Sequence, residues 1–567
     1  MPVAGARAGD SLAAAAGGTA RRPSTVAGVE RRVAAAGFGL LAIACATSVW
    51  PLLSSHAIPA FQQDWTWPLS RQFALQWLHA FVGLWDPRSL GQGNALPWQT
   101  YAVVAQVASI LLFGPSLGLA AWIATLEFGA ACSCVAMLAA FGVRSQPARV
   151  TAALFYALSP VVFTRIAAGH LAYVLAYALL PLAICLGRRT IEQPRAMAAV
   201  ALGVVVGIAG CQIQFLAIAC LAIVPLLAIV PRAAGWPWRL AIAAGIAACV
   251  QLQALLPLTL SSTPALYAGQ PALLSFEYNN SSPLAAAPIM LGYFTKYYES
   301  HALAGAFDVL YVVLVAAVAV AVFASRRAGI YALILIVAGA LLTAGLYGPL
   351  GPALGWGFER VTYFAVFRDL HYFAALTAAG IALSIGLALQ RLNAGFALVA
   401  LALVAWIVAP AATGGELRAI LVPAAYVADT LDDMRTVAQN GPGRVLWLPA
   451  EEPVGLIGAA NAGRDFSAYG PAGNPSVSDD YQNPQLAYAL ATLRAGRPDW
   501  NALSAMNVRY VVFRGYLRSG RIDNFGIGFP MAFAGLSDAA LGRLLARNPR
   551  LVSLRRTALS RVYELPG

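Results

Sequence analysis

Apolar runs of about 20 residues recur along most of the chain, with short polar turns between them. A run of this length is what a helix needs to cross a bilayer, where unpaired backbone polar groups are too costly. The pattern predicts a polytopic α-helical membrane protein with about eleven transmembrane helices. The predicted spans are 33–53, 117–141, 148–164, 171–187, 197–210, 213–230, 239–259, 307–325, 328–347, 372–389 and 394–411.

One part of this pattern has two interpretations. Residues 197–230 fit either two short spans or one long tilted helix, and a single helix would reverse the orientation of everything that follows it. Before the second span, residues 69–84 place Phe73 and Trp77 at helical spacing, which predicts an amphipathic helix on the membrane surface. Residues 101–113 are apolar but short, so we expect a second interfacial helix there.

The apolar runs stop after about residue 411, and the pattern changes to that of a small α/β domain over residues 412–567. About 155 residues is an ordinary length for one domain. The predicted elements are a helix at 424–439, strands at 444–449 and 509–513, a helix at 538–547 and a closing strand at 561–565.

Composition supports the membrane interpretation. Of the 567 residues, 60% are hydrophobic and only 11% are charged, and the mean hydropathy is +0.69. A soluble globular chain has about 25% charged residues. The net charge of +13 does not indicate nucleic-acid binding, because the arginines lie mainly in the tails, the short loops and the last 150 or so residues.

The arginines also predict the topology. Residues 1–32 are expected to form a disordered cytosolic tail, and every second loop after it is basic, as cytosolic loops are. We therefore expect a bacterial inner-membrane protein with a cytosolic N-terminus, a transmembrane domain over residues 33–411 and an extracytoplasmic C-terminal domain. The basic loops contain Arg144 and Arg149, then Arg188, Arg189 and Arg195, then Arg232 and Arg239, then Arg326 and Arg327, and finally Arg391.

The other loops carry different chemistry. These predicted outer loops are 54–116, 260–306 and 348–371, with a tight turn around 165–170. Polar and titratable side chains are therefore expected on one face of the membrane. All five histidines lie in these outer segments: His56, His79, His170, His301 and His371.

Several short motifs follow the spans in a familiar order. They are Leu84-Trp85-Asp86-Pro87, Leu112-Phe113-Gly114-Pro115-Ser116, and Ala157-Leu158-Ser159-Pro160 followed by Gly169-His170 and Pro181. With the first span and the long outer loop that has an Asp near its start, this layout resembles the GT-C superfamily of membrane glycosyltransferases. The resemblance covers roughly residues 33–410. It implies an enzyme that uses polyprenyl-phosphate-linked sugars.

The resemblance implies a role for Asp64. In GT-C enzymes an acidic residue of the first outer loop faces the acceptor, often as the general base. An acceptor hydroxyl needs such a base as it attacks the anomeric carbon, and a partly desolvated carboxylate suits that task. Asp64 could instead cap the surface helix or solvate the loop. Asp86 is a second catalytic candidate, although its place before Pro87 also fits a turn or cap.

The donor phosphate calls for a cation. Arg368 and His371 lie among aromatic residues just before a span, and a guanidinium can bind phosphate oxygens in bidentate fashion. A surface pair between Arg368 and Asp369 is the alternative. Arg165 departs from the basic-loop pattern and, with His170, is a further phosphate-binding candidate, because arginines at membrane depth usually have partners or functions.

The sugar itself requires other contacts. The substrate-binding candidates are Trp65, Glu277, Tyr293, Lys296 and Tyr297, although an interfacial aromatic belt explains the tyrosines equally well. No residue spacing defines a metal site, so no metal ligand is assigned; a divalent ion, Mg²⁺ or Mn²⁺, is the only cofactor considered.

We therefore expect a glycosyltransferase that moves a sugar from a polyprenyl-phosphate donor to a cell-envelope glycan or lipid on the outer face, with inversion and with Asp64 as base. The bilayer, the donor and the acceptor are the expected partners, and nucleic acid is not. The alternatives are a transporter (flippase) or polymerase of lipid-linked glycans, or a non-catalytic GT-C relative that binds envelope glycan.

Overall fold

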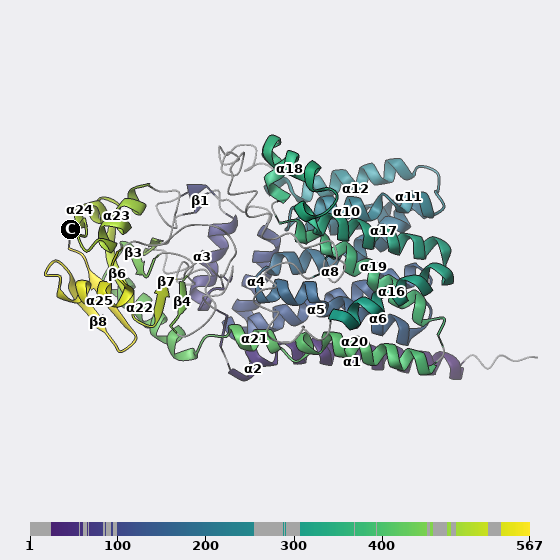
Figure 1. Ribbon diagram of the computed structural model, residues 1–567, viewed down its shortest axis with the longest axis horizontal. Helices are drawn as coiled ribbons and strands as arrows, with labels where there is room; N and C mark the ends of the chain where they lie inside the picture. The colour runs from purple at the N-terminus through teal and green to yellow at the C-terminus, as the bar shows by residue number, and fades with distance from the viewer. Residues whose placement is uncertain are drawn as a thin grey trace, which may run out of the picture.

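The computed structural model describes residues 24–55, 57–59, 65, 67–82, 85–86, 92–93, 99–254, 287, 290, 307–367, 369–392, 394–450, 454–457, 473–477, 484–519 and 535–566. A bundle of helices forms one end of the molecule and a small sheet domain forms the other, with α3 (Arg71–Val82) between them (Figure 1). The protein is therefore mostly helical with a separate mixed domain, as predicted.

The helices of the bundle follow the predicted apolar runs, because a helix satisfies its own backbone hydrogen bonds in an apolar environment. The elements are α1 (Ser24–Ser48), α2 (Trp50–Ser55), α4 (Thr100–Phe113), α5 (Pro115–Ala140), α6 (Gln146–Ala157), α7 (Pro160–Ala167), α8 (Leu171–Glu192), α9 (Ala196–Ala209), α10 (Gln214–Ile223), α11 (Leu226–Ile229), α12 (Trp236–Val250), α16 (Phe307–Ala324), α17 (Arg326–Thr343), η4 (Gly345–Tyr347), α18 (Gly351–Arg360), η5 (Thr362–Phe367), η6 (Leu370–Phe373), α19 (Ala374–Leu389) and α20 (Ala394–Ala412).

Six helical segments among the described residues are long and apolar enough to cross a membrane: Pro115–Ala140, Gln146–Ala167, Leu171–Glu192, Arg326–Thr343, Leu370–Leu389 and Gly395–Ala412. Six shorter apolar helices accompany them, and the other predicted spans fall on these. The count of eleven spans stays a prediction. The stretch 197–230 is not one long helix. It forms α9, then α10 and the short α11, with residues 210–213 between α9 and α10.

Two boundaries differ from the prediction. The predicted tail ended at residue 32, but α1 already begins at Ser24, because residues such as Ala and Arg favour a helix when no proline interrupts them. The first predicted span, 33–53, is divided between α1 and α2 at Val49. Pro51 explains the break, since it has no backbone N–H to continue the ladder of the preceding helix.

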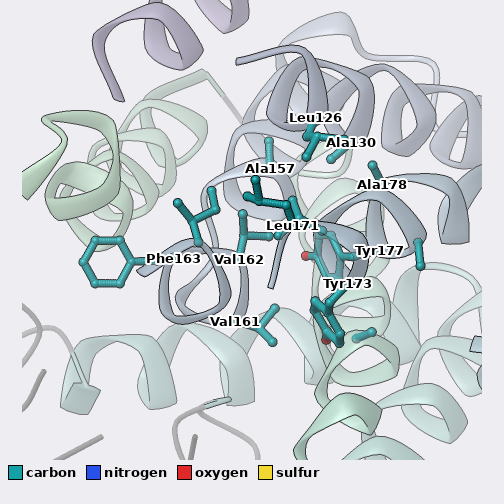
Figure 2. Close-up of a cluster of buried hydrophobic side chains, with 14 of the residues drawn as sticks. Leu126, Ala130, Ala157, Val161, Val162, Phe163, Leu171, Tyr173, Tyr177 and Ala178 are labelled. Carbon is teal, nitrogen blue, oxygen red and sulfur yellow. The ribbon is translucent and has the colours of Figure 1, made fainter. Parts of the chain in front are cut away.

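The third predicted span is also broken. Residues 148–164 form α6 and the start of α7, with Leu158 and Ser159 between the two helices. Pro160 occupies the first position of α7, where its missing N–H costs nothing. Side chains of α5, α6 and α8 lie beside the apolar side chains of α7, and all residues of this short helix are buried in the bundle (Figure 2).

The two segments before α5 are helical as predicted. Phe73 and Trp77 of α3 are buried, on the side that packs against α4. Gly114, with a φ of 84°, separates α4 from α5 and permits the sharp turn between them. The Ser109 hydroxyl donates to the Gly118 carbonyl at 2.7 Å, so α4 folds back onto α5.

The sheet domain begins after α21 (Gly415–Ile420) and contains five strands in the order β5-β3-β6-β9-β8. Strands β5, β3 and β6 are parallel, whereas β9 is antiparallel to both β6 and β8. A separate antiparallel pair joins β4 and β7. The elements are α22 (Ala424–Gln439), β3 (Arg444–Leu448), β4 (Val454–Leu456), β5 (Ser476–Val477), α23 (Pro484–Arg494), α24 (Trp500–Ala505), β6 (Val508–Arg514), β7 (Leu517–Ser519), α25 (Asp538–Arg547), β8 (Val552–Arg556) and β9 (Ser560–Glu564).

Alternate residues of the central strands face opposite helices. Val445 and Trp447 of β3 belong to the apolar cluster that includes α22 and continues into the helical bundle. Leu446 and Leu448 belong to a second cluster with α23, α24 and α25. The period of two along each strand therefore builds a three-layer domain with α22 on one face and three helices on the other.

Candidate functional site

The short helix α7 carries the central residue of the site. Arg165 lies in the last turn of this helix, and Gly169, with a φ of 84°, makes the turn into α8. Arg165 is fully buried, with 0% of its surface exposed. A guanidinium cannot lose its charge at this depth, so it requires partners that compensate for lost water.

Partners from two distant parts of the chain meet Arg165. One guanidinium nitrogen, Nη1, donates to Asp369 Oδ2 at 2.7 Å and lies 2.8 Å from His170 Nδ1. The other, Nη2, lies 3.2 Å from His371 Nδ1. We call Arg165, His170, Asp369 and His371 the Arg165 cluster. It joins the turn between α7 and α8 to the start of α19.

Asp369 also organises its own segment. Its Oδ1 accepts a hydrogen bond from the His371 backbone N–H at 3.1 Å, which caps the short helix η6. One carboxylate therefore both balances the charge of Arg165 and fixes the backbone that carries His371. Removing it would leave a buried charge unpaired, which is among the costliest changes in a protein interior.

Two tyrosine rings enclose the guanidinium. The Arg165 Cζ lies 4.8 Å from the ring centre of Tyr173 and 4.5 Å from that of Tyr372. The rings are themselves 5.3 Å apart, and the Tyr173 hydroxyl donates to the Tyr372 carbonyl at 3.3 Å. Cation–π contacts are stronger in a desolvated site, so the two rings help to hold the guanidinium in one orientation.

A cavity of about 70 Å³ lies next to the cluster, and His170 is part of its wall. Arg165 is not part of the wall, but it contacts His170, which is. The remaining wall is aromatic, amide or apolar. Its residues are Trp65, Trp67, Trp77, Gln99, Ala102, Val103, Gln106, Gly169, Leu171, Ala172 and Gln212.

Two tryptophans tie the first loop to the bundle at this cavity. The Trp65 indole N–H donates to the Ala167 carbonyl at 2.9 Å, and the Trp67 indole N–H donates to the Pro115 carbonyl at 3.0 Å. Both side chains are 1% exposed. Trp67 also packs edge-on against Trp77 with ring centres 5.9 Å apart. Trp65 and Trp67 are therefore fixed against the end of α7 and the start of α5.

Some of the predicted site residues lie together in the structure, one is described only through its backbone, and the others lie outside the described residues. Arg165, His170 and His371 meet in one cluster, and Trp65 reaches the adjoining cavity. Asp86 is described only through its backbone, which pairs with Gln92 in the two-residue strands β1 (Trp85–Asp86) and β2 (Gln92–Gly93). Asp64, Glu277, Tyr293, Lys296, Tyr297 and Arg368 lie outside the described residues.

The alternative of a surface pair with Arg368 placed Asp369 at the surface, but Asp369 is buried; Arg368 lies outside the described residues. Asp369 is 4% exposed and pairs with Arg165, which lies 204 residues earlier in the chain. Burial explains why Asp369 pairs with Arg165. A buried guanidinium has no water to balance its charge, so it needs a carboxylate.

Other residues of the site were missed from the sequence. Trp67, Trp77, Gln106 and Gln212 line the cavity but were not among the candidates. Gln106 and Gln212 are buried amides within apolar runs, and that contrast was the signal that could have identified them. Among the described residues, no three His, Cys, Asp or Glu side chains are grouped as metal ligands.

The fold matches solved membrane glycosyltransferases, although no protein-family model and no curated protein matches the sequence. Arabinofuranosyltransferase AftD from mycobacteria matches with a TM-score of 0.66 and 18% identity over 93% of this chain. The chain spans 40% of the length of that enzyme. ArnT from Cupriavidus metallidurans, bound to undecaprenyl phosphate, matches with a TM-score of 0.51 and 15% identity, covering 93% of this chain and 98% of ArnT. The chain therefore shares the fold of these two enzymes.

Proposed function

We propose that this protein is a GT-C glycosyltransferase that moves a sugar from a polyprenyl-phosphate donor to a hydroxyl of a cell-envelope glycan or lipid. The GT-C fold over nearly the whole chain supports the class, and ArnT was solved with a polyprenyl phosphate bound. The observation that carries the proposal is the Arg165 cluster, a buried cation held by five side chains beside an aromatic, amide-lined cavity.

The reaction would be a single displacement with inversion. The acceptor oxygen forms a bond to the anomeric carbon while the bond from that carbon to the phosphate oxygen breaks. The electron pair of the broken bond stays on the phosphate, and the acceptor proton passes to a base. We keep Asp64 as that base, because its neighbour Trp65 is fixed at the wall of the cavity.

Positive charge beside the departing phosphate would lower the barrier. Arg165 supplies such a charge close to the cavity, because it contacts His170 in the cavity wall. Arg368, from the sequence, is the proposed direct phosphate ligand. We further propose that the N-terminus is cytosolic and the sheet domain extracytoplasmic, from the alternation of the basic loops.

The test is transfer from a panel of radiolabelled polyprenyl-phosphate sugars by purified protein, with Asp64→Asn beside the wild type. We expect transfer from one donor class by the wild type and at least about 100-fold less by the variant, with donor binding retained. Equal rates would assign the base to another residue. A folded wild-type protein that transfers from no donor would contradict the proposed activity and favour a transporter or a non-catalytic relative.

A further inference from the structure

We infer that the cavity beside the Arg165 cluster binds the hydroxyl groups of a sugar ring, and that Gln106 is a specificity-determining residue there. The group bound in this cavity is not a phosphate. The inference rests on the proposed function for the source of the sugar, which is either the donor or the acceptor. Its structural part, the binding of a glycoside, does not depend on activity.

Gln106 is the one amide of an apolar helix. It lies on α4, whose other residues are apolar or carry a hydroxyl. Ala102, Val103 and Gln106 recur at helical spacing, and all three lie in the cavity wall. One face of α4 is therefore turned toward the cavity, and Gln106 is the polar residue of the helix on that face.

The amide of Gln106 has no hydrogen-bond partner among the described residues, although only 5% of the residue is exposed. Protein does not enclose the amide, because the side chain forms part of the cavity wall. Buried polar groups are nearly always hydrogen-bonded, and an exception calls for an explanation. The explanation that fits this position is a partner that enters from the cavity.

Gln212 adds a second amide, and its orientation is fixed. Nε2 of Gln214 donates to the Val366 carbonyl, so Oε1 of Gln214 faces the other way and accepts from Gln212 Nε2 at 2.7 Å. Gln212 is 8% exposed and lies in the cavity wall. This chain of amides uses the N–H side of Gln212, so the acceptor that Gln212 offers to the cavity is its Oε1.

The first-loop tryptophans of the wall contribute ring surface rather than hydrogen bonds. The indole N–H groups of Trp65 and Trp67 both donate to backbone carbonyls, so neither N–H serves a ligand. These side chains offer the cavity the carbon surface of their rings. A sugar ring has apolar C–H faces as well as hydroxyl groups at its edge, so a wall of rings and amides matches both.

The chemistry of the amides selects hydroxyl groups. A phosphate or carboxylate has only acceptors, and an ammonium group has only donors. A hydroxyl has one donor and two acceptor sites, and an amide likewise offers both. Gln106 can therefore donate to one sugar hydroxyl and accept from its neighbour, while Gln212 adds an acceptor. The described wall contains no arginine or lysine, the usual partners of a phosphate.

The first experiment measures binding without transfer. The full-length protein in lipid nanodiscs is titrated with a panel of methyl pyranosides and furanosides, and saturation-transfer NMR detects those that contact the protein. We expect at least one glycoside to bind, and Gln106→Leu to weaken its binding by about 10- to 100-fold. No binding of any glycoside, equal binding by the variant, or displacement of the glycoside by inorganic phosphate would each overturn the inference.

Stability distinguishes an amide that binds a ligand from one that holds the bundle together. Gln106→Leu exchanges the amide for apolar groups of similar size, so the melting temperature should stay the same or rise. Gln251→Leu is the matched control. Gln251 is similarly buried, but its Nε2 donates to the Gly207 carbonyl and it lies outside the cavity wall. That variant should lower the melting temperature, and an equal fall with Gln106→Leu would assign Gln106 to packing.

The second experiment uses deoxy sugars to find the source of the bound ring. The wild type should use an analogue that lacks the hydroxyl bound by Gln106 about 10- to 100-fold less well in kcat/KM, and Gln106→Leu should lose most of that preference. An effect confined to deoxy donors assigns the cavity to the donor sugar, and one confined to deoxy acceptors assigns it to the acceptor. If Gln106→Leu discriminates against every analogue as strongly as the wild type does, Gln106 does not contact the sugar.

The outcomes separate this inference from the proposed function. A protein that binds a glycoside through Gln106 but transfers no sugar supports the inference and contradicts the proposed function. A protein that transfers sugar with the same analogue preferences in the wild type and in Gln106→Leu supports the proposed function and contradicts the inference.

Discussion

The bundle and the sheet domain each contain an arginine paired with buried acid, and the two are built in opposite ways. In the bundle, Arg165 faces one carboxylate, two histidines and two tyrosine rings. In the sheet domain, Arg555 of β8 faces three carboxylates from one helix, α22. The first centre has more donors than acids, and the second has more acids than cations.

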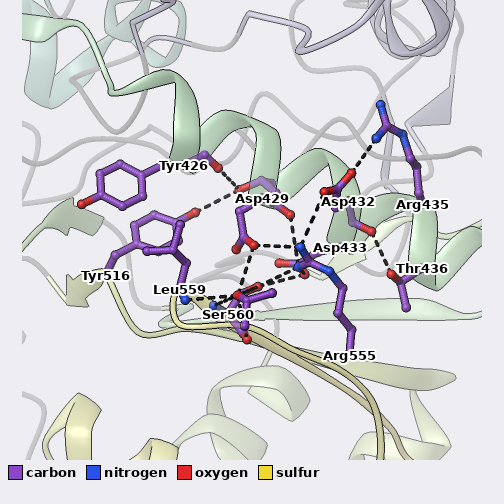
Figure 3. A network of polar contacts seen from close by, with 12 residues as sticks. Tyr426, Asp429, Asp432, Asp433, Arg435, Thr436, Tyr516, Arg555, Leu559 and Ser560 are labelled. Carbon is purple, nitrogen blue, oxygen red and sulfur yellow. Dashed lines mark hydrogen bonds and ion pairs between the residues drawn. The ribbon is translucent and has the colours of Figure 1, made fainter.

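Figure 3 shows the second centre, which we call the Arg555 network. Arg555 Nη2 lies 2.8 Å from Asp429 Oδ1, and Nη1 donates to Asp433. The Ser560 hydroxyl at the start of β9 donates to Asp433 Oδ1 at 2.9 Å. Asp429 and Asp433 are one helical turn apart on the same face, so their shared cation binds α22 to the β8–β9 hairpin.

The contrast distinguishes a polar centre that adjoins a cavity from one that holds two structural elements together. The Arg165 cluster adjoins a cavity, because His170 is part of the cavity wall. The Arg555 network joins two elements of one domain, and none of its residues lines the cavity beside the Arg165 cluster. We therefore expect changes at the first centre to affect transfer and changes at the second to affect stability.

The largest effect is expected for Arg165→Gln. The change leaves Asp369 buried without its counter-ion, which costs about 3–5 kcal/mol of unfolding free energy. It also frees the ring of His170, so transfer should fall by at least about 100-fold. Thermal unfolding and transfer assays on the same preparation measure both. A variant with normal transfer would remove the distinction between the two centres.

A comparable loss of stability without a loss of activity is expected for Arg555→Gln. Asp429 and Asp433 would then share a buried site without a cation, at a cost of about 3 kcal/mol or more. Amide hydrogen exchange in the β8–β9 hairpin of the full-length protein measures the loss of protection. Arg435→Gln is the control, because its pair with Asp432 is exposed and such pairs contribute less than about 1 kcal/mol. Transfer per folded molecule should not change in either variant.

These two centres also show how far the sequence could be interpreted. The helix at 424–439 and the helix at 538–547 coincide with α22 and α25, because apolar positions recur there at helical spacing. The apolar runs of the bundle were equally clear. Their interruptions were not, and the break between α6 and α7 at Ser159 follows from one proline and from packing around α7.

The pairing of Arg165 with Asp369 could not be predicted, because it depends on how α7 and α19 meet in space. The sequence did indicate that Arg165 was unusual, since it interrupts the basic-loop pattern. It gave no indication that His371 would contact Met290, or that Gln106 and Gln212 would reach one cavity. Local patterns specify helices, whereas such contacts are decided by packing between segments far apart in the chain.

A pH effect is expected in the sheet domain. Burial raises the pKa of Asp433 to about 6, and the neighbouring Asp429 adds to the rise, while Ser560 and Arg555 oppose it. Between about pH 4 and pH 6 the folded domain thus holds a proton that the unfolded chain releases. The free energy of unfolding should therefore fall as pH rises through this range, by roughly 3 kcal/mol for this group.

The variant Asp433→Asn should remove that part of the pH dependence. Protection of the β8–β9 hairpin at pH 4.5 and pH 7, corrected for intrinsic exchange, measures it. Asp432→Asn is the control, because Asp432 is about half exposed and only at the edge of the network. An unchanged slope in Asp433→Asn would show that another group titrates.

The smallest effect on transfer is expected from a pair of tryptophan variants. Trp65→Phe removes the hydrogen bond to the Ala167 carbonyl, and Trp447→Phe removes one to the Ser476 hydroxyl in the sheet domain. Each should cost about 1 kcal/mol of stability. Only Trp65→Phe should also slow transfer, by a few-fold, because Trp65 neighbours the proposed base. Equal transfer by both variants would remove the positioning role of Trp65.

The most direct test of the central claim is transfer by the double variant Arg165→Gln/Asp369→Asn beside the wild type. Removing both charges leaves no unpaired ion, so most of the stability lost in Arg165→Gln should return. We expect a folded double variant that transfers sugar at least about 100-fold more slowly than the wild type. A double variant with wild-type transfer would show that the Arg165 cluster only holds the bundle together.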